Sequence, residues 1–244
     1  MIVSIILPTY NESGNIVALI EQIIQNIPEN WDYEIIVVDD NSPDQTYSIV
    51  QKTFKDNEKI KPIIRAADRG LAKSIRAGIE LATGSKIIVM DTDFTHDPVE
   101  IPKMLHISKL YDIVSASRFC AGGKMQSLRH YLASFVFNLL IRLILRTQVQ
   151  DNLGGYFILS KEKINLLPFD SIFFGYGDYY FRLLHYAQVN RLSLVEIPAS
   201  YRSRESGISK SSFLKMLFTY TSALLKLRIE TRHSKYTIID NHTR

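Results

Sequence analysis

The sequence lacks most features of secreted, zinc-binding and membrane-spanning proteins. Cys120 is the one cysteine among 244 residues, so the chain can form neither an intramolecular disulfide nor a cysteine-based zinc site. A membrane-spanning helix needs about 20 consecutive apolar residues. The longest uncharged runs, 131–141 and 216–225, are much shorter. We therefore expect a reduced, intracellular protein without a membrane-spanning helix.

Several common motifs are also missing. Neither Gly-X-Gly-X-X-Gly nor Gly-X4-Gly-Lys-Ser/Thr follows the first predicted strand, which argues against a dinucleotide dehydrogenase and a P-loop NTPase. The absence of Gly-X-Ser-X-Gly argues against an esterase-type hydrolase. Residues 1–7 have no basic n-region and no small-residue cleavage site, so we expect a buried strand there rather than a signal peptide.

Apolar patterns in the first half of the chain alternate between those typical of strands and those typical of helices. Short β-branched runs predict strands, and apolar residues repeating every three or four positions predict helices. The predicted strands are 3–7, 34–38, 61–65, 86–90 and 112–116, and the predicted helices are 12–27, 44–55, 71–83 and 98–109. Repeated strand–helix units indicate an α/β fold with a mostly parallel sheet flanked by helices.

The pattern changes after residue 118. A helix over 128–146 is apolar nearly all round, and residues 213–227 carry one apolar helical face. Strands at 156–159 and 194–198 and a helix at 178–188 complete the prediction. Because no linker separates two units, we expect one domain over residues 1–232, with halves that meet near residue 118, amphipathic C-terminal helices and a tail at 233–244.

Polar residues follow four of the predicted strands, at 10–12, 39–41, 91–93 and 117–118. The carboxyl ends of parallel strands meet at one edge of a sheet, where open α/β sheets bind their ligands. For 41–44 alone, a turn explains the residues equally well. Four such groups together are better explained by a binding site.

Asp91 and Asp93 form the sharpest of these groups. Side chains at i and i+2 of an extended segment point to the same side, and Mg²⁺ is commonly bound by one or two carboxylates together with water and phosphate oxygens. The alternative, a capped loop before the helix at 98–109, explains Asp97 as its N-cap but not the pair. Asp39 and Asp40 suit a nucleoside better than the same cation, and Tyr10 could stack on its base.

Several segments then resemble the family-2 inverting glycosyltransferases with the GT-A fold. They are Pro-Thr-Tyr-Asn-Glu at 8–12, Val-Val-Asp-Asp-Asn-Ser-Pro-Asp at 37–44, Arg-Gly-Leu at 69–71, Val-Met-Asp-Thr-Asp at 89–93 and Ser-Arg-Phe at 117–119. Within this family the chain is most similar to the dolichyl-phosphate (polyprenyl-phosphate) mannose synthases. The residues at 204–210 resemble their late Arg-X-X-Gly-X-Ser-Lys signature. The resemblance runs from residue 3 to about residue 227, and it makes 1–118 the nucleotide-sugar half and 119–232 the acceptor half.

The resemblance implies a role for each matching residue. The nucleoside would be held by Pro8, Tyr10, Glu12, Val38 and Asp40. Asp91 and Thr92 would line the nucleotide-sugar site. Asp93, with Asp91, would bind Mg²⁺ or Mn²⁺ at the donor diphosphate. The arginines would contact phosphate groups: Arg204 the donor diphosphate, Arg118 and Arg129 the acceptor phosphate.

Three positions depart from the family pattern. Thr92 replaces the usual Ala, and Thr95 stands where a Gln often completes the metal shell. Gly-Tyr-Gly-Asp at 175–178 differs from the more usual Gly-Tyr/Phe-Lys, which leaves the choice of sugar open.

The activity implied is metal-dependent, inverting transfer of a hexose to dolichyl or polyprenyl phosphate, with mannose from GDP-mannose as the first expectation. A family-2 enzyme that uses a UDP-sugar or a saccharide hydroxyl acceptor is the alternative. A hydroxyl acceptor needs a general base, for which Asp178 is the candidate, although a carboxylate at a helix N-terminus explains Asp178 equally well. A noncatalytic sugar-nucleotide-binding subunit is disfavoured by the presence of Asp91, Asp93, Arg118 and Arg204 together.

The distribution of charge indicates a membrane surface as partner. The net charge of +4 is too small to indicate nucleic acid by itself. Residues 118–146 contain five Lys or Arg and no acidic residue, and residues 201–235 contain eight against two Glu. These basic residues accompany aliphatic faces rather than exposed aromatic rings, which favours anionic lipid over nucleic acid. We expect a cytoplasmic protein, peripheral on the cytoplasmic face of a membrane; a membrane anchor subunit or a homo-oligomer could cover the same faces.

Overall fold

The computed structural model of the chain describes residues 1–125, 128–201 and 213–233. Arg204 therefore lies outside the described residues, as does the side chain of Arg129, whose backbone is in the first turn of a helix. The predicted tail at 233–244 also lies outside them, apart from its first residue, His233, which ends the last helix.

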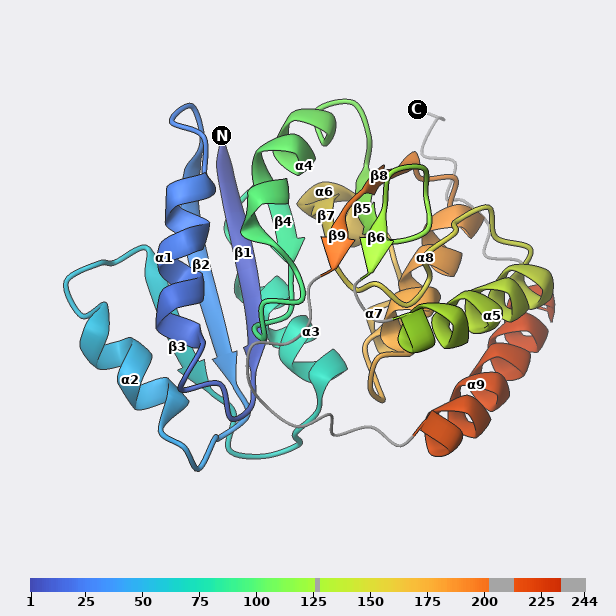
Figure 1. Cartoon of the computed structure of the whole chain (residues 1–244), viewed down its shortest axis with the longest axis horizontal. Helices are drawn as coiled ribbons and strands as arrows, with labels where there is room; N and C mark the ends of the chain where they lie inside the picture. The colour runs from blue at the N-terminus through green and yellow to red at the C-terminus, as the bar shows by residue number, and fades with distance from the viewer. Residues whose placement is uncertain (126–127, 202–212, 234–244) are drawn as a thin grey trace, which may run out of the picture.

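A seven-stranded sheet forms the centre of the fold (Figure 1), in the order β3-β2-β1-β4-β7-β5-β8. These strands are β1 (Ile2–Thr9), β2 (Asp32–Asp39), β3 (Ile60–Ile64), β4 (Lys86–Val89), β5 (Ile113–Ser117), β7 (Phe157–Ser160) and β8 (Leu194–Pro198). All neighbours are parallel except β7, which runs antiparallel to both β4 and β5. The mostly parallel sheet is confirmed. Because β7 is reversed on both sides, the carboxyl ends of the other six strands still share one edge.

Helices cover both faces of this sheet. They are α1 (Ile16–Asn26), α2 (Thr46–Thr53), α3 (Leu71–Leu81), α4 (Ile101–Ile107), α5 (Leu128–Leu145), α6 (Lys161–Ile164), α7 (Phe169–Ile172), α8 (Tyr179–Val189) and α9 (Phe213–His233). The predicted helix at 98–109 begins as a 3₁₀ turn, η1 (Pro98–Glu100), and Asp97 caps it as expected by accepting the Val99 N–H at 3.1 Å. A second, two-stranded sheet pairs β6 (Lys124–Met125) with β9 (Ser200–Tyr201).

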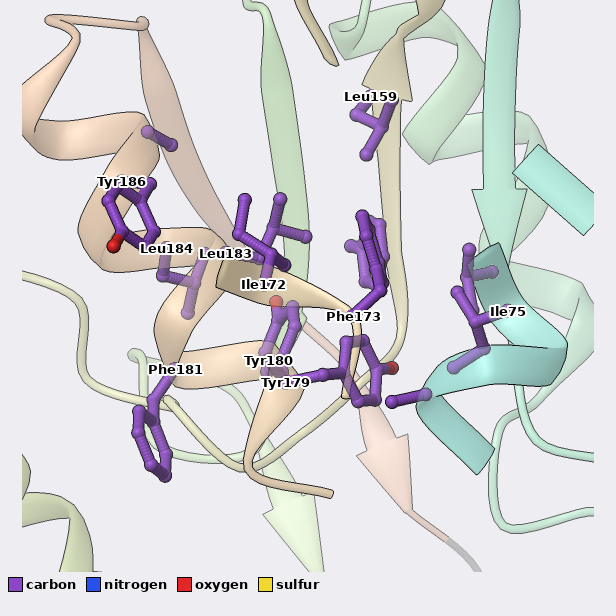
Figure 2. Packing of buried hydrophobic residues seen from close by; sticks show 14 of the residues in the cluster. Ile75, Leu159, Ile172, Phe173, Tyr179, Tyr180, Phe181, Leu183, Leu184 and Tyr186 are labelled. Atoms are coloured by element: carbon purple, nitrogen blue, oxygen red, sulfur yellow. The ribbon is translucent and has the colours of Figure 1, made fainter. Parts of the chain in front are cut away.

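The core is divided by the sheet into two apolar clusters, because successive side chains of a strand point to opposite faces. On β1, Ile5 and Leu7 pack toward α1 and α4, whereas Ile6 packs toward α3 and α8. Figure 2 shows part of the second cluster, with Phe173 between Ile75 of α3 and the aromatic residues of α8. Because both faces of the sheet are buried, its central strands consist of nearly continuous apolar residues.

A buried carboxylate ties the strands together near their amino ends. Glu34 of β2 accepts hydrogen bonds from Ser4 of β1 (2.5 Å), from the Thr83 backbone N–H (2.6 Å) and from Lys61 of β3 (2.6 Å). Burial raises the pKa of Glu34, but these bonds outweigh it and lower the pKa to about 2. Glu34 thus stabilises the fold in its ionised form.

The replacement Glu34→Gln is expected to lower the free energy of unfolding at pH 7 by about 2 kcal/mol, after allowance for the half-exposed Lys61. Because the folded pKa lies below the unfolded value, the contribution is complete above about pH 4.5 and is lost as the pH falls toward 2. Urea unfolding of both proteins between pH 3 and 7 measures the difference. Equal stability of the two proteins across this range would contradict the assignment.

Candidate active site

The four strand ends predicted to form a site lie along the same sheet edge, and the backbone beyond three of them has an uncommon conformation. Asn11 follows β1 with φ of 61°, Asn41 follows β2 with φ of 56°, and Phe94 follows β4 with φ of 62°. Positive φ is uncommon outside glycine and is costly for a bulky residue such as Phe. Such conformations concentrate at functional sites, where surrounding contacts enforce them.

Asp40 joins the end of β2 to the start of α3. Its Oδ1 accepts from Arg65 Nη1 at 2.6 Å and from Ser74 Oγ at 2.7 Å, and its Oδ2 accepts the Gly70 N–H at 2.7 Å. A carboxylate has about four acceptor positions, so this network leaves room for about one donor from a ligand. The sequence did not reveal Arg65 as the partner of Asp40.

Tyr10 and Glu12 lie on the segment after β1. Tyr10 is exposed, and the guanidinium carbon of Arg69 lies 5.8 Å from its ring centroid. Glu12 is half-buried, and its Oε2 accepts from the Asn15 side chain at 3.0 Å. An exposed aromatic ring offers a face on which a nucleobase can stack.

Pro8, Val38 and Thr92 are buried where β1, β2 and β4 end. The Val38 side chain packs in the core with Ile6 and Ile36. Thr92 Oγ1 donates to the Pro8 carbonyl oxygen at 3.5 Å and so connects the segment after β4 to β1. A nucleoside at this edge would therefore meet the backbone of Pro8 and Val38 rather than their side chains.

The turn from Asp91 to Thr95 holds the two candidate metal ligands. Asp93 is 7% exposed, and its Oδ1 accepts from the backbone N–H of Thr95 (3.1 Å) and from its hydroxyl (2.6 Å). The Asp91 side chain is 45% exposed. Within the described ranges no group of three or more His, Cys, Asp or Glu side chains is placed to hold a metal. Two carboxylates fit Mg²⁺ or Mn²⁺ that fills its remaining positions with water and diphosphate oxygens.

Arg118, at the end of β5, lies in a buried ion pair. Its Nε and Nη2 donate to Asp151 at 2.8 and 2.7 Å, and its backbone N–H donates to the same carboxylate at 3.0 Å. Burial opposes the charge of Arg118, but the carboxylate outweighs it and raises the pKa of the guanidinium above its ordinary value. An acceptor phosphate could use only the remaining N–H groups, chiefly those of Nη1. Asp151 was missed in the sequence, where it stands before an Asn-Leu-Gly-Gly turn.

Asp178, the candidate base, is also buried and paired. It forms a short ion pair with Arg182 of α8, four residues on, and its Oδ1 accepts the Tyr176 N–H at 2.8 Å. The carboxylate thus fixes the loop at 175–178 to the first turn of α8. A base role for Asp178 stays a prediction, and it would require this ion pair to open.

Comparison with known proteins decides the family. Residues 4–167 match the model of the family described as Glycosyl transferase family 2. This chain belongs to glycosyl transferase family 2. The resemblance seen in its motifs is therefore confirmed, and the chain is classed as a glycosyltransferase.

The names of two relatives of this glycosyltransferase refer to mannose and to a dolichol or polyprenol phosphate. It is 33% identical over 233 residues to the dolichol-phosphate mannosyltransferase of Pyrococcus furiosus, covering 93% of this chain and 64% of that protein. It is 31% identical over 218 residues to the polyprenol monophosphomannose synthase of Mycolicibacterium smegmatis, covering 85% and 80%. The chain thus spans somewhat less than two thirds of the Pyrococcus protein.

The fold is shared with more distant enzymes. Glucosyl-3-phosphoglycerate synthase from Mycobacterium tuberculosis, solved with Mn²⁺, UDP-glucose and phosphoglyceric acid, superposes with a TM-score of 0.73 at 16% identity. The match covers 93% of this chain and 79% of that one. This similarity confirms the GT-A fold of the glycosyltransferase.

Proposed function

We propose that this glycosyltransferase transfers a hexose from a nucleotide sugar to a dolichyl or polyprenyl phosphate, with GDP-mannose as donor and inversion at the sugar. The observation that carries the proposal is the Asp91–Asp93 turn, which lies at the same sheet edge as the nucleoside-contact candidates Tyr10 and Asp40. The names of the two relatives support the lipid phosphate as acceptor and mannose as the sugar.

Asp93 and Asp91 are the residues that would hold Mg²⁺ or Mn²⁺ beside the donor. Such a cation, when bound, stabilises the negative charge that develops on the leaving nucleoside diphosphate. The bonds from Thr95 fix one oxygen of Asp93, so that its carboxylate is oriented before the donor arrives. Arg204 is the proposed cationic contact to the same diphosphate.

The acceptor explains why no general base is required. A phosphate monoester has a second pKa of about 6 and is therefore mostly ionised at pH 7. Its oxygen can attack the sugar without losing a proton to the enzyme, so the protein needs only to orient it. Arg118 and Arg129 are proposed for this task. The ion pair between Asp178 and Arg182 agrees with an enzyme that does not use Asp178 as a base.

The acceptor can be tested directly. Radiolabelled product extracted into organic solvent is measured with a short polyprenyl phosphate, with the matching polyprenol and with a free saccharide as acceptor. The proposal predicts labelled lipid from the phosphate alone. Label on the polyprenol or the saccharide would move the acceptor to a hydroxyl and make Asp178→Asn the next variant.

The outer face of α5 supports a membrane-bound acceptor. Its exposed side chains include Leu132, Phe135, Val136, Leu139 and Leu143. The opposite face of α5 packs in the core against α9, which lies beside it at one end of the molecule (Figure 1). No helix in the described ranges is long and apolar enough to cross a bilayer. We propose that the exposed apolar face of α5 lies in the membrane interface, on the cytoplasmic face, next to exposed basic residues such as Arg142 and Arg146.

The double variant Val136→Glu/Leu143→Glu tests this placement, because these side chains are 65% and 69% exposed. Its binding to anionic vesicles is expected to fall at least about tenfold, since two apolar side chains no longer enter the interface. Leu110→Glu, which replaces an apolar residue 78% exposed outside α5, is the matched control and should bind as the wild type does. Unchanged vesicle binding, together with loss of a dimer in gel filtration, would assign the face to a homo-oligomer instead.

A further inference from the structure

His96 is a deeply buried polar side chain in contact with the candidate metal ligand Asp91. It is 1% exposed, and both ring nitrogens are engaged. Its Nδ1 lies 2.8 Å from the backbone nitrogen of Asp91, and its Nε2 lies 3.1 Å from the carbonyl oxygen of Gly154. A backbone N–H can only donate and a carbonyl can only accept, so the ring proton is on Nε2.

Two tyrosines hold the imidazole in this orientation. The ring of Tyr156 stacks on it at 4.9 Å with an interplanar angle of 10°, and Tyr201 meets it edge-on at 4.8 Å. Tyr156 immediately precedes β7 and Tyr201 ends β9, so three separate parts of the chain fix one side chain. The ring has little freedom to turn without breaking both hydrogen bonds.

The Asp91 N–H bond closes the turn that carries the two carboxylates. Phe94, inside this turn, has φ of 62°. This conformation reverses the direction of the chain, so that the His96 ring contacts the backbone N–H of Asp91. Nε2 of His96 also lies 3.8 Å from Asp91 Oδ2. Two sets of hydrogen bonds therefore fix the strained turn. Thr95 donates to the Asp93 carboxylate, and the Asp91 backbone N–H donates to His96 Nδ1.

The Gly154 bond connects this turn to the loop that holds Arg118. Gly154 lies between Asp151, the partner of Arg118, and β7. An added Cβ on Gly154 would lie 2.9 Å from the Tyr201 hydroxyl and 3.2 Å from Asp151 Oδ2, so the Gly154 loop is closely packed against these two side chains. His96 thus links the donor side of the site to its acceptor side.

We propose that His96 is a positioning residue: its two hydrogen bonds fix the Asp91–Asp93 turn against the Gly154 loop in the geometry that binds a divalent cation with the donor diphosphate. The inference rests on the proposed function for the identity of this ligand. Residues that orient metal ligands without touching the metal commonly change metal affinity by about 10- to 100-fold when replaced. The same magnitude is expected for His96.

Mn²⁺ binding in the presence of GDP, followed by electron paramagnetic resonance, tests this without any turnover. His96→Phe preserves a ring for Tyr156 and Tyr201 but removes both hydrogen bonds, and should weaken Mn²⁺ binding about 10- to 100-fold. His96→Asn offers an oxygen near the Nδ1 position that can accept the Asp91 N–H, and should recover a substantial part of the affinity. His106→Asn, on the exposed side of α4, is the matched control and should bind Mn²⁺ as the wild type does.

A purely structural role predicts a different result. His96→Phe would then melt at a lower temperature, yet bind Mn²⁺ normally well below that temperature, and this result would overturn the proposal. Equal weakening in the Asn and Phe variants would also overturn it, because the Asp91 bond would then be irrelevant. The Mn²⁺-binding assay contains no acceptor, so its result does not depend on sugar transfer. A failure to label lipid in the transfer assay would reject the proposed function but leave the Mn²⁺-binding result for His96 unchanged. Absence of Mn²⁺ binding by the wild type with GDP or UDP would reject both.

Discussion

Asp93→Asn is expected to lower the rate of sugar transfer by about 1,000-fold or more while the protein remains folded. Asn is the same size as Asp, and its Oδ1 can still accept the two bonds from Thr95, so the turn should persist. What is lost is the negative charge that would hold the cation against the donor diphosphate. A loss of 1,000-fold corresponds to about 4 kcal/mol of transition-state stabilisation, which is typical of a metal's contribution.

Single-turnover transfer with saturating donor measures this loss, and circular dichroism confirms the fold. Asp97→Asn is the matched control, because Asp97 is equally buried and its cap on Val99 can be made by an Asn oxygen. The control should retain activity within about threefold. If Asp93→Asn kept more than about a tenth of wild-type activity with Mg²⁺ present, Asp93 would not be the metal ligand.

Replacement of Asp151 is expected to have the largest effect on stability. Asp151 is fully buried and forms a two-bond ion pair with Arg118, which is also buried. Asp151→Ala would leave the guanidinium charge buried without its partner, which typically costs about 3–5 kcal/mol. Urea unfolding gives this value directly. Glu230→Gln on α9, which removes an exposed ion pair with Lys226, should cost less than about 1 kcal/mol.

A double replacement separates the net contribution of the Arg118–Asp151 ion pair to stability from the cost of removing only one partner. Arg118→Met/Asp151→Leu removes both charges and fills similar volume, so it should be more stable than Asp151→Ala alone. A double variant as unstable as the single one would show that the cost comes from the backbone N–H groups of Arg118 and Leu153, which lose Asp151 as their acceptor, rather than from an unpaired charge. A loss of less than about 1 kcal/mol in Asp151→Ala would contradict the buried pair itself.

Most of the fold could be predicted because it depends on local periodicity. The strands and helices of the first half lie within a few residues of their predicted bounds, since apolar spacing reports the buried face of each element. The reversed direction of β7 could not be predicted. Its first three residues, Phe157, Ile158 and Leu159, form an apolar run that fits either direction, and the path of the preceding chain decides which one occurs.

The candidate site was predictable in part, for a similar reason. Asp91 and Asp93 follow a recognisable strand, so their place at the sheet edge can be inferred from sequence. The pair between Asp178 and Arg182 is spaced i,i+4 and could have been noticed on a helix. The bonds of Arg118 to Asp151 and of His96 to Gly154 join residues 33 and 58 positions apart. Contacts at that separation depend on the assembled sheet, and no local sequence pattern predicts them.

The most direct test of the proposed function is a transfer assay with three labelled donors, GDP-mannose, UDP-glucose and UDP-GlcNAc, and a short polyprenyl phosphate, each with Mg²⁺ and with EDTA. We expect labelled mannosyl lipid that forms with Mg²⁺ and is abolished by EDTA. Lipid labelled from a UDP-sugar would agree with a lipid-phosphate acceptor but would contradict GDP-mannose as the donor. Binding of a nucleotide sugar without any labelled lipid would contradict transfer to a lipid phosphate and favour a hydroxyl acceptor or a noncatalytic subunit.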